Sequence, residues 1–188
     1  MIWGNKKDFL TANKYPKRKL NRLPGFNYAE TGGYFVTLCV EGGSHLLGYA
    51  ADGGVQLSEI GQVAHDQFAE LQECYEKVSI DCFVVMPNHV HAIVMIKGIF
   101  NTGISLPRVI QAYKSMTIRK IKKYKINFKW QRSYHDSIIK TGYGLERIRE
   151  YINSNPTKWG EDAENYALKI DKKEYYRAIT ESMKEETV

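Results

Sequence analysis

The sequence predicts an α+β fold in which an antiparallel sheet of the ferredoxin-like or RRM-like type carries helices packed mainly on one face. The elements follow the order strand, helix, strand, strand, helix, strand, helix. The two central strands are joined by a connection that is too short for a parallel pair. A chain of 188 residues with 43% apolar content also fits a single well-buried domain.

Each element has a local signal. Strands are expected where β-rich runs occur, at 34–40, 80–86 and 89–96, with a short hairpin around ADGGVQL and a further strand within FKWQRSYHDSIIK. Helices are expected where apolar residues recur at helical spacing, at 57–78 with Ser58 as N-cap, at 105–124, and at 143–155. Pro156 disfavours helical geometry at Asn155 and ends the last of these.

Charge divides the chain into three parts. We expect a basic N-terminal arm at 1–30, a domain at 31–160, and a charged C-terminal helix or tail at 161–188. The last part holds eight acidic and five basic residues, a net charge of −3. Because the whole chain has a net charge of +6, the first 160 residues carry +9. No acidic residue lies between Asp81 and Asp136, whereas ten lysines and arginines do. Such a window indicates a polyanionic partner, although a solvated helix face explains many lysine runs.

Several classes of protein are disfavoured. The three cysteines form no CxxC pair and leave an odd thiol, which argues against a disulfide framework and a thiolate zinc site. No secretory signal and no apolar run of about eighteen residues is apparent, so we expect a cytoplasmic, nucleoid-associated protein.

Two histidines interrupt the apolar run VVMPNHVHAIVMI. Alternate residues of a strand share a face, so His89 and His91 are expected to project side by side. Two imidazoles one strand step apart can hold a metal ion, but His-x-His alone also fits a structural pair near a strand end. A further ligand is needed to separate the two interpretations.

The last helix offers such a ligand. Gly144, Ile148, Tyr151 and Asn155 fall on one helical stripe, so a phenol and an amide are expected to face inward together. Taken separately, Tyr151 fits ordinary core and Asn155 fits a helix end. The adjacent Tyr175 and Tyr176 lie in a charged helical pattern that implies no histidine partner, and we set them aside as nucleophiles.

Five segments in this order resemble the REP-associated tyrosine transposases, relatives of the single-tyrosine HUH transposases of insertion sequences. They are RLPGFNY, YFVTLCV, FVVMPNHVHAIVMI, WQRSYHDSIIK and LERIREYINSNPTKW. MPNHVH followed by REYINSNPTKW is the most specific part. The resemblance implies the HUH transposase fold, with His89, His91 and Asn155 as metal ligands and Tyr151 as the nucleophile. The acidic segment after Trp159 has no counterpart in it.

The activity implied is metal-dependent cleavage and transfer of single-stranded hairpin DNA of the REP type through a covalent 5′-phosphotyrosine. Nitrogen and oxygen ligands without thiolate suit Mg²⁺ or Mn²⁺. The protein is expected to act as a monomer or a homodimer. The residues expected to contact DNA are Arg18, Lys19, Arg22, Lys114, Arg119, Lys120, Lys122, Lys123 and Arg132. A replication-initiator or relaxase-type nickase and a non-catalytic RRM-like nucleic-acid-binding domain remain as alternatives.

Overall fold

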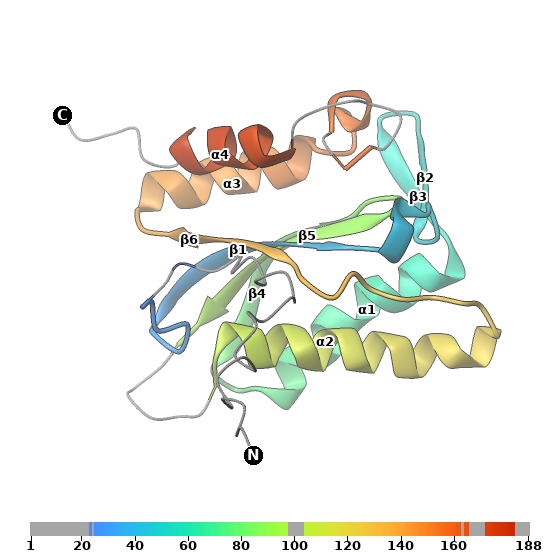
Figure 1. Cartoon of the computed structure of the whole chain (residues 1–188), viewed down its shortest axis with the longest axis horizontal. Coiled ribbons are helices and arrows are strands. Elements are labelled where there is room, and N and C mark those ends of the chain that lie inside the picture. The colour runs from blue at the N-terminus through green and yellow to red at the C-terminus, as the bar shows by residue number, and fades with distance from the viewer. Residues whose placement is uncertain (1–22, 24, 98–103, 163, 166–171, 183–188) are drawn as a thin grey trace, which may run out of the picture.

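The two strands that are buried along almost their whole length, β1 (Gly32–Cys39) and β5 (His89–Ile96), form the centre of a four-stranded antiparallel sheet, with β4 (Val78–Val85) and β6 (His135–Ile139) at its edges. The computed structural model describes residues 23, 25–97, 104–162, 164–165 and 172–182. The strand order β4-β5-β1-β6 and the helices around the sheet confirm the predicted α+β class (Figure 1).

Helices cover both faces of the sheet. α1 (Glu59–Cys74) and α2 (Leu106–Ile121) pack on one face, and α3 (Gly142–Ser154) and α4 (Lys172–Ser182) lie on the other (Figure 1). We expected the helices to pack mainly on one face, but only α1 and α2 share a face, and α3 and α4 cover the opposite one. The physical reason is that both faces of the central strands are apolar, as Val36 and Leu38 pack toward α1 and α2 while Phe35 packs with α3.

The register of β1 and β5 sets the face on which the histidines lie. Cys39 pairs with His89 and Thr37 pairs with His91. The two imidazoles therefore project to the α3 side, whereas Val90 and Ala92 enter the core beneath α1 and α2. This confirms the alternation predicted from the strand period.

A small hairpin, β2 (Gly48–Ala51) and β3 (Gly54–Leu57), precedes α1 as predicted. The residue before this hairpin is hydrogen-bonded to the Pro87–Asn88 turn: the backbone N–H of Leu47 donates to the carbonyl of Pro87 at 2.9 Å. The Leu47 carbonyl in turn accepts from the backbone N–H of Ser58 at 3.0 Å. Ser58 caps α1 as expected, since its hydroxyl oxygen accepts from the N–H of Gly61 at 3.0 Å.

The boundaries of the three predicted parts are only partly visible. Most of the arm at 1–30, including Arg18, Lys19 and Arg22, lies outside the described residues. At the other end, Asp162, Glu164 and Asn165 are buried. This stretch just after residue 160 is thus packed against the rest of the structure, and α4 lies further along the predicted C-terminal helix or tail.

Gly61 is expected to tolerate no side chain, although it lies inside a helix where alanine usually stabilises. A β-carbon at this position would meet the Leu47 carbonyl oxygen at 1.8 Å. We predict that Gly61→Ala lowers the free energy of unfolding by about 2 kcal/mol or more in urea denaturation. Gly142→Ala is the control, since a β-carbon there meets nothing within 4 Å. Equal stability of the two variants would contradict the close approach of α1 to residue 47.

Candidate metal centre and nucleophile

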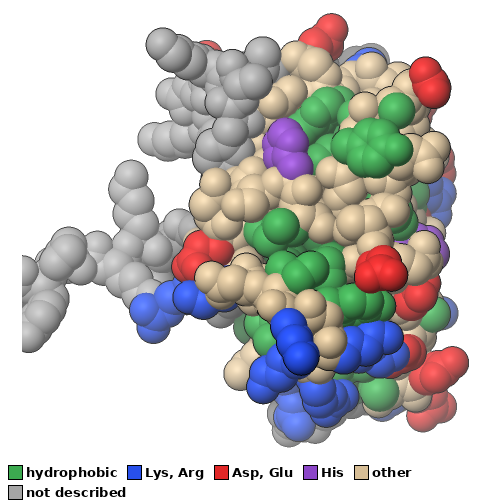
Figure 2. All heavy atoms as spheres, turned by 90° about the vertical axis from the view of Figure 1, so that its right-hand side faces the viewer, with side chains coloured by type: hydrophobic (Ala, Val, Ile, Leu, Met, Phe, Trp, Pro, Cys, Tyr) green, Lys and Arg blue, Asp and Glu red, His purple; other side chains and the backbone are tan. Residues whose placement is uncertain are grey.

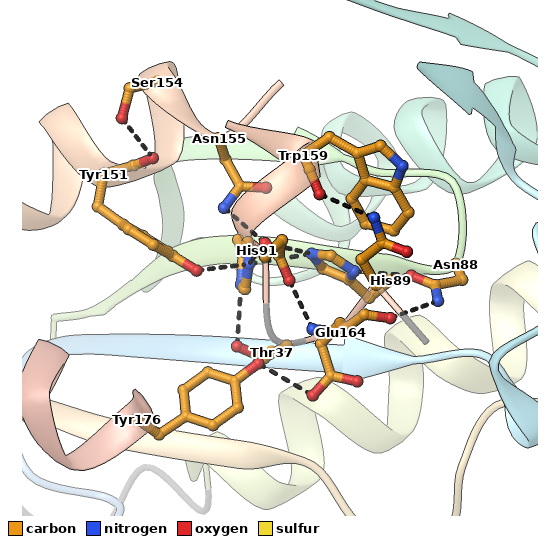
Figure 3. Close-up of polar contacts among 12 residues, drawn as sticks. Thr37, Asn88, His89, His91, Tyr151, Ser154, Asn155, Trp159, Glu164 and Tyr176 are labelled. Carbon is orange, nitrogen blue, oxygen red and sulfur yellow. Dashed lines mark hydrogen bonds and ion pairs between the residues drawn. The ribbon is translucent and has the colours of Figure 1, made fainter. Parts of the chain in front are cut away.

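Four side chains from three segments converge on the α3 side of the sheet (Figure 3). The Nε2 atoms of His89 and His91 lie 3.0 Å apart, and each lies 3.8 Å from Oδ2 of Asp162. The hydroxyl oxygen of Tyr151 lies 3.1 Å from Nε2 of His91. Both imidazoles and the carboxylate are buried, so the polar groups face one another and not bulk water.

The outer nitrogen of each imidazole is held by a neighbouring side chain. Nδ1 of His89 donates to Oδ1 of Asn88 at 2.9 Å, and Nδ1 of His91 lies 2.9 Å from the hydroxyl oxygen of Thr37. A hydrogen on Nδ1 leaves the lone pair of Nε2 directed inward. Where both imidazoles carry this hydrogen, with the Thr37 hydroxyl accepting from His91, the two lone pairs lie 3.0 Å apart and repel each other unless a proton or a cation sits between them. The arrangement therefore fits a cation site.

Asn155 and Asp162 are hydrogen-bonded to each other next to the histidine pair (Figure 3). Nδ2 of Asn155 donates to Oδ2 of Asp162 at 2.9 Å, while Oδ1 of Asn155 is buried and has no hydrogen-bond partner among the described residues. Oδ1 of Asp162 accepts from the backbone N–H of Glu164 at 2.6 Å. A buried amide oxygen without a partner is costly and is a further sign that a cation belongs here.

Asp162 is an ionised group in this site. Burial by itself raises the pKa of Asp162, but its interactions with His91 and His89 outweigh burial and hold the pKa well below the usual value. Among the described residues, His89, His91 and Asp162 form the one group of histidine, cysteine and acidic side chains whose ligand atoms, all within 4.8 Å of one another, could hold a metal ion. Two imidazoles and a carboxylate suit a divalent cation.

Tyr151 is held beside the histidines by the packing of α3. Ile148 and Ile152 are buried against Phe35 and Ile93 of the sheet. The Tyr151 ring packs edge-on against Phe35 and His91, with centroid distances of 5.7 and 5.1 Å. The structure thus brings together the four residues that the sequence assigned to one site, His89, His91, Tyr151 and Asn155. Their chemical roles remain predictions.

Sequence reasoning missed the contribution of the C-terminal segment. Asp162 follows the helix stop at Pro156, and no strand or helix period relates it to the histidines. Its one signal is that it is the second acidic residue of the acidic segment after Trp159. The ring of Trp159 lies 6.0 Å from that of His89, so this segment covers the histidine side of the site.

Tyr176 also lies at the site, although the sequence implied no histidine partner for it. Its ring stacks on His135 with centroids 4.6 Å apart, and its hydroxyl donates to Oε1 of Glu164 at 3.2 Å (Figure 3). Burial and the charge of Glu164 raise the pKa of Tyr176 well above its usual value. A phenol with a raised pKa is a poor nucleophile, so Tyr151 remains the candidate.

The basic residues assigned to DNA fall into two groups. Lys114 and Lys120 are engaged within the protein: Nζ of Lys114 donates to the carbonyls of Gln131 and Ser133 at 2.8 and 3.1 Å, and Lys120 pairs with Glu70. Burial lowers the pKa of Lys114 to about 8. The remaining described members are exposed, namely Arg119, Lys122, Lys123 and Arg132.

Three of these exposed residues lie where α2 ends. Arg119 is in its last turn, and Lys122 and Lys123 belong to the short helix η2 (Lys122–Tyr124) that follows. Figure 2 shows lysine and arginine side chains gathered at one end of the face on which α2 ends. We call Arg119, Lys122 and Lys123 the basic cluster. None of the described helices is both long and apolar enough to span a membrane.

Comparisons with known proteins agree with this geometry. The family model "Transposase IS200 like" matches residues 56–155. An uncharacterized protein of Haemophilus influenzae is 31% identical over 164 residues, covering 77% of this chain and 91% of that protein. The solved structure of a REP-associated tyrosine transposase bound to a REP hairpin is similar at 19% identity, with a TM-score of 0.55 over 72% of each chain. At that identity the likeness supports the fold.

The cation site can be tested without any assay of activity. We predict that His89→Gln, His91→Gln and Asp162→Asn each weaken Mn²⁺ binding in calorimetric titration by at least about 100-fold while the protein stays folded. Asn155→Ala is expected to weaken binding as well, because its Nδ2 donates to Oδ2 of Asp162, the oxygen that lies 3.8 Å from Nε2 of both imidazoles. His65→Gln is the control, since this exposed imidazole contacts Asp66 on α1. Unchanged Mn²⁺ affinity with a lowered melting temperature would mean that the histidines are only packing residues.

Proposed function

The chain belongs to the family of IS200-like transposases, and on that premise we propose that it cleaves and rejoins single-stranded DNA with Tyr151 as nucleophile. One observation carries the proposal: the Tyr151 hydroxyl oxygen lies 3.1 Å from a histidine of the candidate cation site. A nucleophile beside a Lewis-acid site is an arrangement that promotes phosphodiester cleavage, because the cation polarises the phosphate that the nucleophile attacks.

His89, His91 and Asp162, together with the free oxygen of Asn155, would hold a divalent ion. Nitrogen and oxygen ligands without thiolate favour Mg²⁺ or Mn²⁺. When bound, such an ion polarises the scissile phosphodiester and offsets negative charge in the transition state. Asn88 and Thr37 orient the imidazoles from behind, so the ligand atoms are fixed before DNA arrives.

Tyr151 would attack the phosphorus atom. Its oxygen forms a bond to phosphorus and loses its proton, the bond from phosphorus to the 3′ oxygen breaks, and that oxygen leaves as a hydroxyl. The product is a 5′-phosphotyrosine and a free 3′ end. Because the phosphoester is retained, the 3′ hydroxyl of a second strand can attack it and release Tyr151, so that cutting turns into joining.

The proposed substrate is single-stranded DNA folded into a hairpin. The structurally similar REP-associated tyrosine transposase is bound to such a hairpin, and this chain has the charge to bind one. The basic cluster would follow the DNA backbone. In Figure 1, the end of α2 lies at the same end of the molecule as the start of β5, which carries His89. A strand bound at the basic cluster would thus lie at the same end of the molecule as the site and would reach it around the end of the sheet, because α2 and the imidazoles lie on opposite sides of the sheet (Figure 1).

One alternative from the sequence is disfavoured by the layers of the fold. An RRM-type RNA-binding domain stacks bases on an open sheet face. Here α1 and α2 cover one face and α3 covers the other, and the central strands β1 and β5 are almost entirely buried. No open face of the sheet is left for stacking in the part of the chain that the structure describes.

Tyr151→Phe tests the nucleophile. We predict that it lowers the yield of covalent protein–DNA adduct on end-labelled hairpin DNA with Mn²⁺ by at least about 1,000-fold, because one oxygen atom is removed. DNA affinity is expected to stay within about twofold of the parent value, because the basic surface is intact. Tyr143→Phe, an exposed tyrosine on the same helix, serves as control. Adduct formation by Tyr151→Phe at the parent rate would refute the assignment.

The basic cluster can be tested through the salt dependence of binding. We predict that the double variant Lys122→Gln/Lys123→Gln binds all hairpin sequences more weakly and that the slope of log affinity against log salt becomes shallower by roughly 1.4 to 1.8. Lys120→Gln, in which the replaced lysine is already paired with Glu70, is expected to change the slope much less. Parent-like slopes for both variants would place the DNA elsewhere.

A further inference from the structure

An irregularity in the edge strand β4 accompanies a salt bridge to the helix that carries Tyr151. Ile80 pairs with Val94 and Cys82 pairs with Ile93, so Asp81 is an extra residue without a partner on β5. The side chains of Val78 and Ile80 before it and of Phe83 beyond it all pack toward α1 and α2. A regular strand would not place residues 80 and 83 on one face. The insertion of Asp81 makes this a β-bulge, a feature that commonly re-aims a side chain.

The bulged side chain contacts α3. Nε of Arg149 donates to Oδ1 of Asp81 at 2.7 Å, and a terminal nitrogen donates to Oδ2 at 2.6 Å. The other terminal nitrogen donates to Oε1 of Glu146 on the same helix at 2.5 Å. This is the two-pronged geometry in which a guanidinium fixes a carboxylate in direction as well as in distance. The hydrogen bonds from Arg149 also hold the pKa of Asp81 below its usual value, so the carboxylate is charged at neutral pH.

The rest of the contact between α3 and the sheet is a short apolar stripe. Ile148 and Ile152 are its two fully buried apolar side chains, against Phe35 and Ile93, and Leu145 and Tyr151 are partly buried beside them. In addition, the thiol of Cys82 on β4 donates to Oδ1 of Asn153 at 3.5 Å. At about 100° per residue, Arg149 and Tyr151 lie about 160° apart around the helix, on opposite flanks of this apolar stripe. A roll of the helix by only about 10° would move the Tyr151 oxygen by roughly 1 Å, because that atom lies well outside the helix axis.

We propose that Asp81 and Arg149 are positioning residues, which prevent α3 from rolling on the sheet and so hold the Tyr151 hydroxyl beside His91. The proposal rests on the proposed function of Tyr151 as nucleophile. The pair acts from the flank of the helix that faces away from the reacting atoms, and neither residue contacts the candidate ligands. Since both partners belong to one chain, they align the tyrosine with the histidines of that same chain.

The test separates positioning from binding and from folding. Asp81→Asn and Arg149→Gln are expected to lower the single-turnover rate of adduct formation at saturating hairpin DNA and Mn²⁺ by about 10- to 100-fold, the cost of misplacing reacting groups by about 1 Å. DNA affinity, Mn²⁺ affinity and melting temperature are expected to stay close to those of the parent. Exchanging the charges, Asp81→Arg with Arg149→Asp, is expected to recover most of the rate.

Arg147→Gln is the matched control, because Arg147 pairs with Glu150 on the same helix surface. Its rate is expected to equal that of the parent. Parent-like rates for Asp81→Asn and Arg149→Gln would overturn the positioning role while leaving the proposed function intact. A rate that falls only in step with the melting temperature, without recovery in the exchanged pair, would overturn it as well. Absence of an adduct in the parent protein would overturn the proposed function and the positioning role together.

Discussion

The candidate site depends on one contact, between the Nε2 atoms of the buried His89 and His91, which lie 3.0 Å apart. Neutral histidines in this arrangement direct two lone pairs at the same space, and burial removes the water that would otherwise solvate them. The ionised Asp162 and the unpaired amide oxygen of Asn155 add further negative potential. A cation relieves all of these costs at once, so the site is organised around a positive charge.

Asn88 explains why a proline and an asparagine precede the histidines in an apolar run. Its carbonyl accepts from the backbone N–H of Val40 at 2.8 Å, and its Oδ1 holds the imidazole of His89. Its Nδ2 donates to the carbonyls of Gly43 and Glu164. The backbone and side chain of Asn88 together thus connect the segment after β1, the start of β5 and the C-terminal segment, and the turn at Pro87–Asn88 brings the residue to the point where the three meet. The interruption of the strand is therefore structural as well as chemical.

The parts of the site that could be predicted are those that obey a period. A period of two put His89 and His91 on one face, and a period of 3.6 put Tyr151 and Asn155 on one stripe. The resemblance to transposases is confirmed at the level of the IS200-like family. Asp162 could not be found this way, because no period relates a residue beyond the helix stop at Pro156 to the histidines. Tyr176 does lie in a helical pattern, but that pattern does not indicate which part of the sheet the helix contacts. The engagement of Lys114 and Lys120 was also hidden, since their partners lie 17 and 50 residues away.

The charges of the candidate site and of the basic cluster act on the same DNA phosphates. DNA phosphates approaching the site meet the carboxylate of Asp162, which would repel them if its charge were not offset. A divalent cation reverses the sign of the site, so phosphate and metal favour each other's binding. On the proposed function, the basic cluster at the end of α2 would attract the same backbone at a distance, where no acidic residue of the 82–135 window opposes it. The surface charge would then concentrate DNA at this end of the molecule, while the buried charges would make productive binding depend on the metal.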